Sequence, residues 1–318
     1  MALGTAHVIL SEVPNFVPEL WSDEVIASYK KNIVAASLVR KLNHRGKKGD
    51  TIKIPTPTRG AAVDKSAETQ VTLQQHGTDA GISILINKHK EYSRLIEDIV
   101  DVQALESLRR FYTDDAGYAI SKRVDSDILV EFFNTGSASL TVNATTGVLE
   151  TASTFDEIRE GDGTIWDEGA TTDIADAGIR QYIKLLDDAD VPFSERFLII
   201  PTIVKQDLLG LARFTETQFV GEAAAANQIR NGIVGNVYGV DVYVTTNTPI
   251  VEDSAAGEDN IAGFMFQRDA LVLVEQLGVR SQSQYKQEYL ADLFTADMIY
   301  GVKTVRADNV VTFVVPTT

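Results

Sequence analysis

The sequence has no cysteine among its 318 residues, and this absence excludes several kinds of chemistry. Such a chain has no disulfide framework, no thiolate nucleophile and no zinc–thiolate site, and it fits a reducing compartment. Its stability must come from packing or from assembly. With 44% hydrophobic residues the chain can bury a large core, and its length is typical of two domains or one elaborate domain.

Long hydrophobic runs are absent too. The first residues, MALGTAHVIL, lack the basic start and the long apolar stretch of a signal peptide. No later run approaches the roughly 18 to 20 apolar residues that cross a bilayer. We therefore expect a soluble protein that makes no membrane contact and is not exported through a signal peptide.

Histidine is scarce, and the sequence carries no catalytic motif. The four histidines, His7, His44, His76 and His89, have spacings that place no two of them on one helical face. The GxSxG, P-loop and HExxH motifs are missing, and the glycines between residues 232 and 239 do not follow a nucleotide-binding fingerprint. These glycines predict turns. We expect that the protein is not an enzyme and has no cofactor, no catalytic residue and no metal ligand.

Carboxylates are the only abundant reactive side chains. Six of them gather in one loop: Asp156, Glu157, Glu160, Asp162, Asp167 and Glu168. A glycoside hydrolase or a calcium site would use such residues, but their spacing fits neither. We interpret the loop as a solvated acidic face. A calcium site, and a carboxylate-dependent hydrolase that uses Glu157 and Asp167, stay open as alternatives.

Basic residues are few and unevenly placed. There are 29 against 45 acidic residues, and the net charge of -16 argues against general affinity for nucleic acid. Between Tyr29 and Lys53 only Asp50 is acidic, whereas eight residues are basic: Lys30, Lys31, Arg40, Lys41, Arg45, Lys47, Lys48 and Lys53. Residues 150–190 hold twelve acidic and three basic residues. These segments are either solvated faces or a basic arm that meets an acidic surface on a neighbouring copy.

A long segment with few apolar residues separates two strands that look like partners. Residues 49–55, GDTIKIP, alternate as a strand does, and alternation returns at residues 81–86. From residue 56 to 81 the large aliphatic residues are only Val63, Val71 and Leu73. A hairpin of this kind is marginal in water by itself. The loop is therefore either mobile or completed by contacts with a second molecule.

Proline is missing from residue 58 to 191, and this stretch contains the longest predicted helix. Asp101 is a plausible N-cap, and apolar residues then recur at steps of three and four up to Asn134. A helix over residues 102–134 would extend roughly 50 Å. Gly117 is the only helix-breaking residue inside it.

The second half of the chain predicts shorter elements. Residues 136–154 alternate like a surface hairpin, and Thr172 or Asp173 begins a helix that ends before Pro192. A compact α/β unit then follows, with a strand at 196–201, a helix at 202–211 and a strand at 240–244. The last seventy residues predict one sheet that packs on the long helix, with strands at 261–266, 270–275, 279–285, 296–305 and 310–315.

Taken in order, these pieces resemble the major capsid protein of tailed bacteriophages. Its fold, the Hong Kong 97-like fold, is shared with encapsulin shells and the floor of the herpesvirus capsid. Residues 18–21, the basic stretch and residues 49–52 look like the N-terminal arm that enters the extended loop of this family. Residues 101–134 match the spine helix. Residues from about 171 to 249 look like the axial domain, and they include Gly232 to Gly235 followed by Tyr238 to Val242.

The resemblance implies an α+β Hong Kong 97-like capsid fold with five parts. They are an N-terminal arm at 1–48, an extended β-hairpin loop at 49–92, a peripheral domain with the spine helix and a hairpin insertion at 93–170, an axial domain at 171–250, and return strands of the peripheral domain at 251–318. The segment 136–170 is longer than the simplest members need, and we interpret it as a surface elaboration.

The resemblance also implies a function. Copies would assemble as pentamers and hexamers into an icosahedral phage head, which encloses double-stranded DNA without sequence-specific binding. The expected location is the virion, with the host cytoplasm during assembly. Because the chain begins directly at the arm, we expect a separate scaffolding protein, together with a portal and a candidate decoration protein. An encapsulin-like shell and a tail or receptor-binding protein are the alternatives of related kind.

Seven residues are candidates for contacts between subunits on this interpretation: Trp21, Arg45, Lys47, Lys48, Lys65, Val71 and Leu73. Some members of the family fuse a loop lysine to a neighbour's asparagine. Lys65 lies in the corresponding loop, but no motif identifies its partner, so the sequence does not decide whether a cross-link forms.

Overall fold

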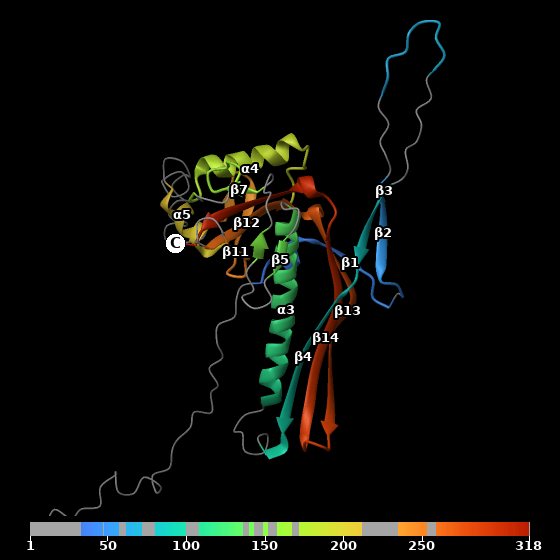
Figure 1. The fold of residues 1–318 in the computed structure, drawn as a ribbon, viewed down its shortest axis with the longest axis vertical. Helices are drawn as coiled ribbons and strands as arrows, with labels where there is room; N and C mark the ends of the chain where they lie inside the picture. Colours follow the sequence, from blue (N-terminus) through green and yellow to red (C-terminus); the bar gives the residue numbers. More distant parts are fainter. Residues whose placement is uncertain are drawn as a thin grey trace, which may run out of the picture.

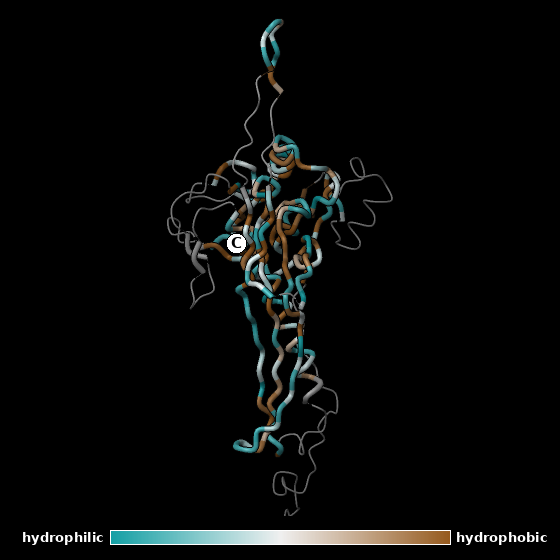
Figure 2. The backbone as a smooth tube through the Cα atoms, turned by 90° about the vertical axis from the view of Figure 1, so that its right-hand side faces the viewer, coloured by the Kyte–Doolittle hydropathy of each residue, from teal (hydrophilic) through white to brown (hydrophobic). Residues whose placement is uncertain are grey.

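A computed structural model provides the structure of the protein, and eleven segments of the chain are described. They are residues 33–46, 48–56, 62–71, 80–99, 108–135, 140–142, 149–151, 158–166, 172–211, 235–252 and 259–317. The molecule is elongated, with a body of helices and sheets, a long ribbon at one end and a projecting hairpin at the other (Figure 1). Hydrophobic segments gather in the body, and hydrophilic segments lie at both ends of the long axis (Figure 2).

The long helix α3, Leu108–Thr135, is the axis of the body. Its 28 residues extend about 42 Å at 1.5 Å per residue. Ala116, Ile120, Val124, Ile128 and Phe132 recur every four residues and are all buried, which explains why this face packs on the sheets. The predicted helix is confirmed over residues 108–134. Its predicted N-cap, Asp101, lies outside the described segments.

A four-stranded sheet forms the ribbon beside α3 (Figure 1). Its strands, in spatial order, are β1 (Arg40–Asn43), β13 (Leu271–Lys286), β14 (Ala291–Thr304) and β4 (Lys88–Glu97). The two separate strands predicted at 270–275 and 279–285 are one continuous strand, so that prediction is wrong. Two register shifts, between Glu275 and Leu277 and between Leu277 and Arg280, carry β13 past Gly278 without ending its pairing with β14.

A nine-stranded mixed sheet forms the rest of the body. Its strands are β5 (Leu140–Val142), β6 (Leu149–Thr151), β7 (Arg159–Glu160), β8 (Arg196–Ile200), β9 (Asn236–Val237), β10 (Val240–Val244), β11 (Ile250–Glu252), β12 (Asp259–Gln267) and β15 (Val310–Pro316). The predicted strands at 196–201 and 240–244 and the hairpin within 136–154 are confirmed. Val237 and Val240 pair across a two-residue turn, where Tyr238 and Gly239 have positive φ angles of 50° and 85°.

The closing strands do not form one sheet, which corrects the sequence prediction. β12 and β15 pair with each other in the nine-stranded sheet, whereas β13 and β14 belong to the ribbon. The chain changes sheet at two short 3-10 turns, η3 (Arg268–Ala270) and η4 (Ala307–Asn309), which contact each other. Both sheets pack against α3, since buried residues of β12, β13, β14 and β15 share one hydrophobic core with this helix.

Two helices cover the nine-stranded sheet: α4 (Asp176–Asp188) and α5 (Thr202–Gly210). The prediction for α5 is confirmed, but α4 begins three to four residues after the predicted start. Ala175 is extended and donates its backbone N–H to the carbonyl of Gly161 at 3.0 Å. Gly178, in the first turn, touches the same carbonyl, so close that a β-carbon there would collide with it. Contact with the preceding loop therefore explains why α4 begins at Asp176 and not at Thr172 or Asp173.

That preceding loop, residues 158–166, is part of the core. Ile158 and Trp166 are buried, and β7 pairs with β15. Glu160 is also buried and accepts a hydrogen bond from Thr172 at 3.2 Å. The interpretation of this stretch as a solvated surface elaboration is therefore wrong for these residues. Asp156, Glu157, Asp167 and Glu168 lie outside the described segments.

The described segments contain neither a membrane-spanning helix nor a metal-binding cluster. No helix in them is long and apolar enough to cross a membrane. The same segments hold no group of three or more side chains arranged to bind a metal ion.

Candidate assembly surfaces

The projecting hairpin consists of β2 (Thr51–Thr56) and β3 (Ala80–Leu85), which pair in a two-stranded sheet of their own. Ile52 faces Ile84 and Ile54 faces Ile82, as the alternation in the sequence predicts. Ile84 is fully buried and packs with Val272 and Val274 of β13. The base of the hairpin is thus held on the ribbon by a hydrophobic cluster separate from the main core.

Close backbone contacts fix the direction of the hairpin. Ile86 donates its N–H to the carbonyl of Asp50 at 2.7 Å, and Gln276 donates a side-chain N–H to the carbonyl of Gly49 at 2.8 Å. On β14, Gly301 lies directly beneath the carbonyl of Leu85, where a β-carbon would be 2.4 Å from the oxygen. These contacts hold the base of the hairpin, β2 and β3, against the ribbon.

The tip of the hairpin, residues 62–71, is exposed throughout and lies far from the body (Figure 1). Val63 is 69% exposed and Val71 is 64% exposed, so the subunit itself covers neither side chain. Lys65 is exposed beside them. The backbone N–H of Thr69 donates to the carbonyl of Ser66 at 3.4 Å and its hydroxyl donates to the same oxygen at 2.7 Å, forming a local turn. The tip therefore presents uncovered apolar side chains.

The opposite end of the molecule is the turn between β13 and β14. Tyr289 and Leu290 are 64% and 65% exposed there. The turn is tied to β4, because Asp98 donates its N–H to the carbonyl of Leu290 at 3.1 Å and accepts a hydrogen bond from the hydroxyl of Tyr285 at 2.8 Å. A second ordered apolar patch therefore lies at the far end of the ribbon.

The basic arm is partly neutralised within its own subunit. Arg45 lies 2.7 Å from Glu275, and Arg40 lies 3.5 Å from Asp269. No ion pair among the described residues involves Lys48, which is exposed. The charge of Lys48 is therefore not compensated by any described residue, whereas Arg45 and Arg40 are neutralised by acidic residues of β13 and η3.

Two carboxylates of α3 connect it to its surroundings. Asp125 is buried, and it accepts hydrogen bonds from the N–H groups of Ala35 (2.7 Å) and Ala36 (3.4 Å) in the short helix α1 (Ala35–Leu38). Asn247, after β10, donates to its other oxygen at 3.1 Å. Burial raises the pKa of the Asp125 carboxyl above its ordinary value, although these hydrogen bonds oppose the shift. Asp125 thus ties the arm and the nine-stranded sheet to α3.

Asp127 ties α3 to the ribbon. The hydroxyl of Tyr300 on β14 donates to Oδ2 at 2.7 Å, and Lys88 and Lys90 of β4 lie 3.3 Å and 3.8 Å from the same oxygen. Arg123, one turn earlier in α3, lies 3.5 Å from Oδ1. Burial and the bond to Asp127 raise the pKa of the Tyr300 phenol far above its usual range, so it stays a donor.

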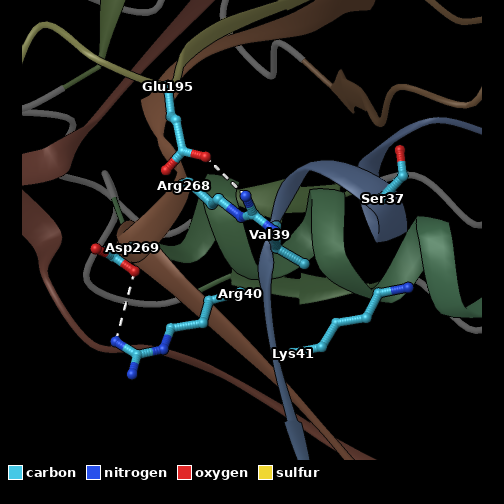
Figure 3. A pocket seen from close by; sticks show the side chains of 7 residues that line it. All are labelled: Ser37, Val39, Arg40, Lys41, Glu195, Arg268 and Asp269. Atoms are coloured by element: carbon cyan, nitrogen blue, oxygen red, sulfur yellow. Dashed lines mark hydrogen bonds and ion pairs between the residues drawn. The ribbon is translucent and has the colours of Figure 1, made fainter.

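A cavity of about 540 Å³ lies between the arm and η3 (Figure 3). Arg40 and Lys41 of β1 line one side, and Glu195, Arg268 and Asp269 line the other. Glu195 accepts a hydrogen bond from Arg268 at 2.7 Å, whereas Lys41 extends away from both ion pairs (Figure 3). The cavity is polar and open, and no catalytic arrangement of side chains lies in it.

Comparison with known proteins gives the fold a context. No family model matches the chain, and no curated protein matches it either. A solved structure from Mycobacterium phage Che8 is 23% identical with a TM-score of 0.71, and the match covers 94% of this chain and 97% of that one. The capsid structure of cyanophage P-SCSP1u is 18% identical with a TM-score of 0.73, covering 96% and 95%. A chain of the mature capsid of bacteriophage PhiM1 is 13% identical with a TM-score of 0.71, covering 95% and 93%.

The chain has a phage capsid fold. The predicted α+β Hong Kong 97-like class is confirmed, since these matches run over nearly all of both chains. Within this capsid fold, Lys65 and Val71 are on the hairpin tip, and Arg45 and Lys48 are at the entry to the hairpin. Trp21, Lys47 and Leu73 lie outside the described segments. The four described residues thus lie at two places, the tip and the base of the hairpin, and the roles of all seven between subunits stay predictions.

Sequence reasoning missed the two carboxylates that hold the capsid fold together. Asp125 and Asp127 lie between the apolar residues Val124 and Ile128 inside the predicted helix. A carboxylate on the buried face of a helix is costly without partners, and this was the available signal. Their partners come from β4, β14, α1 and the chain after β10, so the sequence alone could not identify them.

Proposed function

We propose that this protein is a major capsid protein, whose copies assemble as pentamers and hexamers into an icosahedral phage head around double-stranded DNA. The observation that carries the proposal is the capsid fold, matched over more than nine-tenths of the chain by phage capsid structures. In this role the protein is structural and has no enzymatic activity.

The hairpin supports the proposal physically. Its base is anchored by Ile84 and Ile86, while its tip exposes Val63 and Val71 to solvent. Exposed apolar side chains at the tip of a projecting hairpin favour contact with another surface. When every copy reaches onto the next in the same way, the contact is heterologous and closes into a ring. In such a ring the tip of each copy contacts one neighbour, and the other neighbour's tip contacts that copy.

The charge balance is compatible with a container for DNA. Tight binding of phosphate needs clustered cations, and the chain carries a net charge of -16. A wall of this composition would let DNA enter and leave without being held. A separate scaffolding protein, a portal and a decoration protein are the further partners of the proposal, with the virion as the final location and the host cytoplasm as the place of assembly.

The same proposal assigns the parts of the chain. Residues 1–48 form the arm, 49–92 the extended loop, 93–170 and 251–318 the peripheral domain, and 171–250 the axial domain. β12 pairs along β8 as well as β15, so the return strands would join the two domains through one sheet.

Assembly of the purified protein tests the function. We expect closed particles or ring oligomers at micromolar concentration in physiological salt, with or without a scaffolding protein. Light scattering measures the mass, and negative-stain electron microscopy shows whether particles close. A monodisperse monomer under both conditions would contradict the proposal. An enzyme inside the particles instead of DNA would favour the encapsulin-like alternative.

A further inference from the structure

A second cavity, of about 330 Å³, adjoins the one between the arm and η3. Arg40 and Asp269 line both cavities, so the two form one groove that passes over this ion pair. The groove runs from the arm to the base of the hairpin, where Ile54 and Pro55 line its far end. It therefore borders the elements that the proposed function uses for assembly.

The groove is cationic on a strongly acidic protein. Its lining contains four cations, Arg40, Lys41, Arg268 and Arg306, against two carboxylates, Glu195 and Asp269. The difference, four minus two, is a local charge of +2, while the whole chain carries -16. Charge complementarity thus favours an acidic occupant.

The far half of the groove is apolar. Leu42, Ile54, Pro55, Val272 and Val305 line the second cavity around Arg306. The apolar lining favours a large hydrophobic side chain, and Arg306 favours an acidic residue next to it. The occupant should therefore combine an apolar anchor with carboxylates a few residues away.

One segment of the chain has this composition. Residues 18–24, PELWSDE, contain three carboxylates and no cation, and Leu20 and Trp21 stand between them. Pro18 favours an extended backbone for the residue before it. Tryptophan is the residue type most often found as the central anchor of an interface.

We propose that the groove binds residues 18–24 of a second copy of this chain. Trp21 enters the apolar half, and Glu19, Asp23 and Glu24 face the cations of the other half. The inference rests on the proposed function and names one of the contacts that assembly would make.

The proposed function favours a second copy as the donor. The described arm runs from Ile33 through α1, held by Asp125, into β1, and the groove lies beside Ser37 of α1 and residues 39–42 that follow it. The proposed function surrounds each copy with others, and a neighbouring copy is the donor that this arrangement supplies.

Disulfide trapping tests the contact, because the chain contains no cysteine of its own. Two double variants combine Ser22→Cys with Ser37→Cys or with Lys41→Cys, both on the groove. After mild oxidation of assembled protein, we expect a ladder of linked subunits on a non-reducing denaturing gel. The single-cysteine variants are the controls and should give no ladder. A link confined to single subunits, or no link with either pair, would overturn the proposal.

An assembly titration gives a second readout. We expect Trp21→Ala to raise the concentration for half-maximal assembly at least about tenfold, as loss of an interface anchor does. Phe16→Ala, an aromatic residue outside the segment, should leave it unchanged. Absence of wild-type particles would reject the proposed function itself. Wild-type particles combined with normal assembly of Trp21→Ala would reject the groove contact alone.

Discussion

Gly301 lies where the base of the hairpin crosses β14. A β-carbon added there would be 2.4 Å from the carbonyl oxygen of Leu85, and backbone cannot move aside as a flexible side chain can. We expect Gly301→Ala to lower the free energy of unfolding by about 1 to 3 kcal/mol, the usual cost of overpacking. Urea denaturation of the unassembled subunit measures this change.

Gly117 provides the matched control. It lies inside α3, and nothing is within 4 Å of the position that a β-carbon would take. Gly117→Ala should raise the free energy of unfolding by about 0.5 to 1 kcal/mol, because alanine favours the helix. Similar effects from the two substitutions would speak against the close contact at Gly301.

Asp125 should make stability depend on pH. Burial raises its pKa above the ordinary 3.8, so the folded chain keeps the proton to a higher pH than the unfolded chain. The stability from this proton is complete below the unfolded pKa and is lost as the pH rises through the folded pKa. Asp125→Asn cannot titrate. We therefore expect the free energy of unfolding of the wild type to fall relative to this variant as the pH rises through that window.

Unfolding free energies of both proteins at a series of pH values check this prediction. Asp188→Asn is the control, because Asp188 is exposed and its only described ion pair, with Lys184, is 3.8 Å long. Its curve should stay parallel to that of the wild type. If the curve for Asp125→Asn is also parallel to that of the wild type, burial does not raise the pKa of the Asp125 carboxyl.

The elements differ in how far the sequence predicts them. α3, the β2–β3 hairpin, β8, α5 and β10 follow from apolar periodicity, because each is defined by its own residues. The start of α4 does not, since Gly161 and Gly178 in contact decide it. Neither does the division of the last strands between two sheets. That division depends on η3 and η4, turns of three residues whose effect is visible only when both sheets are present.

The hairpin is predicted to be necessary for assembly and dispensable for folding. Replacing residues 57–79 by Asn-Gly would close β2 and β3 with a tight turn, while Ile84 and Ile86 keep the base in place. We expect an unchanged urea midpoint, because the described tip, residues 62–71, is exposed throughout. We also expect no closed particles, measured by electron microscopy and light scattering.

Two results would contradict this prediction in different ways. Normal particles from the shortened protein would mean that the tip is not an assembly contact. A large loss of subunit stability would mean that the tip contributes to the fold. Circular dichroism of the shortened protein separates the second result from a simple failure to assemble.

At the scale of the whole molecule, charge is segregated. The basic stretch around the arm and the acidic stretch at 150–190 lie far apart in the sequence, and the chain as a whole is acidic. Arg40 and Arg45 pair within the subunit, so the sequence overestimates the free charge of the arm. The sequence could not have shown this, because Asp269 and Glu275 lie more than two hundred residues away.

Lys48 is the described arm residue best suited to test attraction between copies. It is exposed, and no described ion pair engages it, so charge reversal should leave the subunit fold intact. We expect Lys48→Glu to reduce the yield of particles at low salt. The difference from wild type should shrink near 1 M salt, where the Debye length falls to about 3 Å. Lys184→Glu, on the acidic helix α4, is the control with the same charge change. Equal yields of Lys48→Glu and wild type at low salt would exclude an electrostatic role for the arm at this position. If Lys48→Glu and Lys184→Glu reduce the yield equally, net charge alone governs assembly.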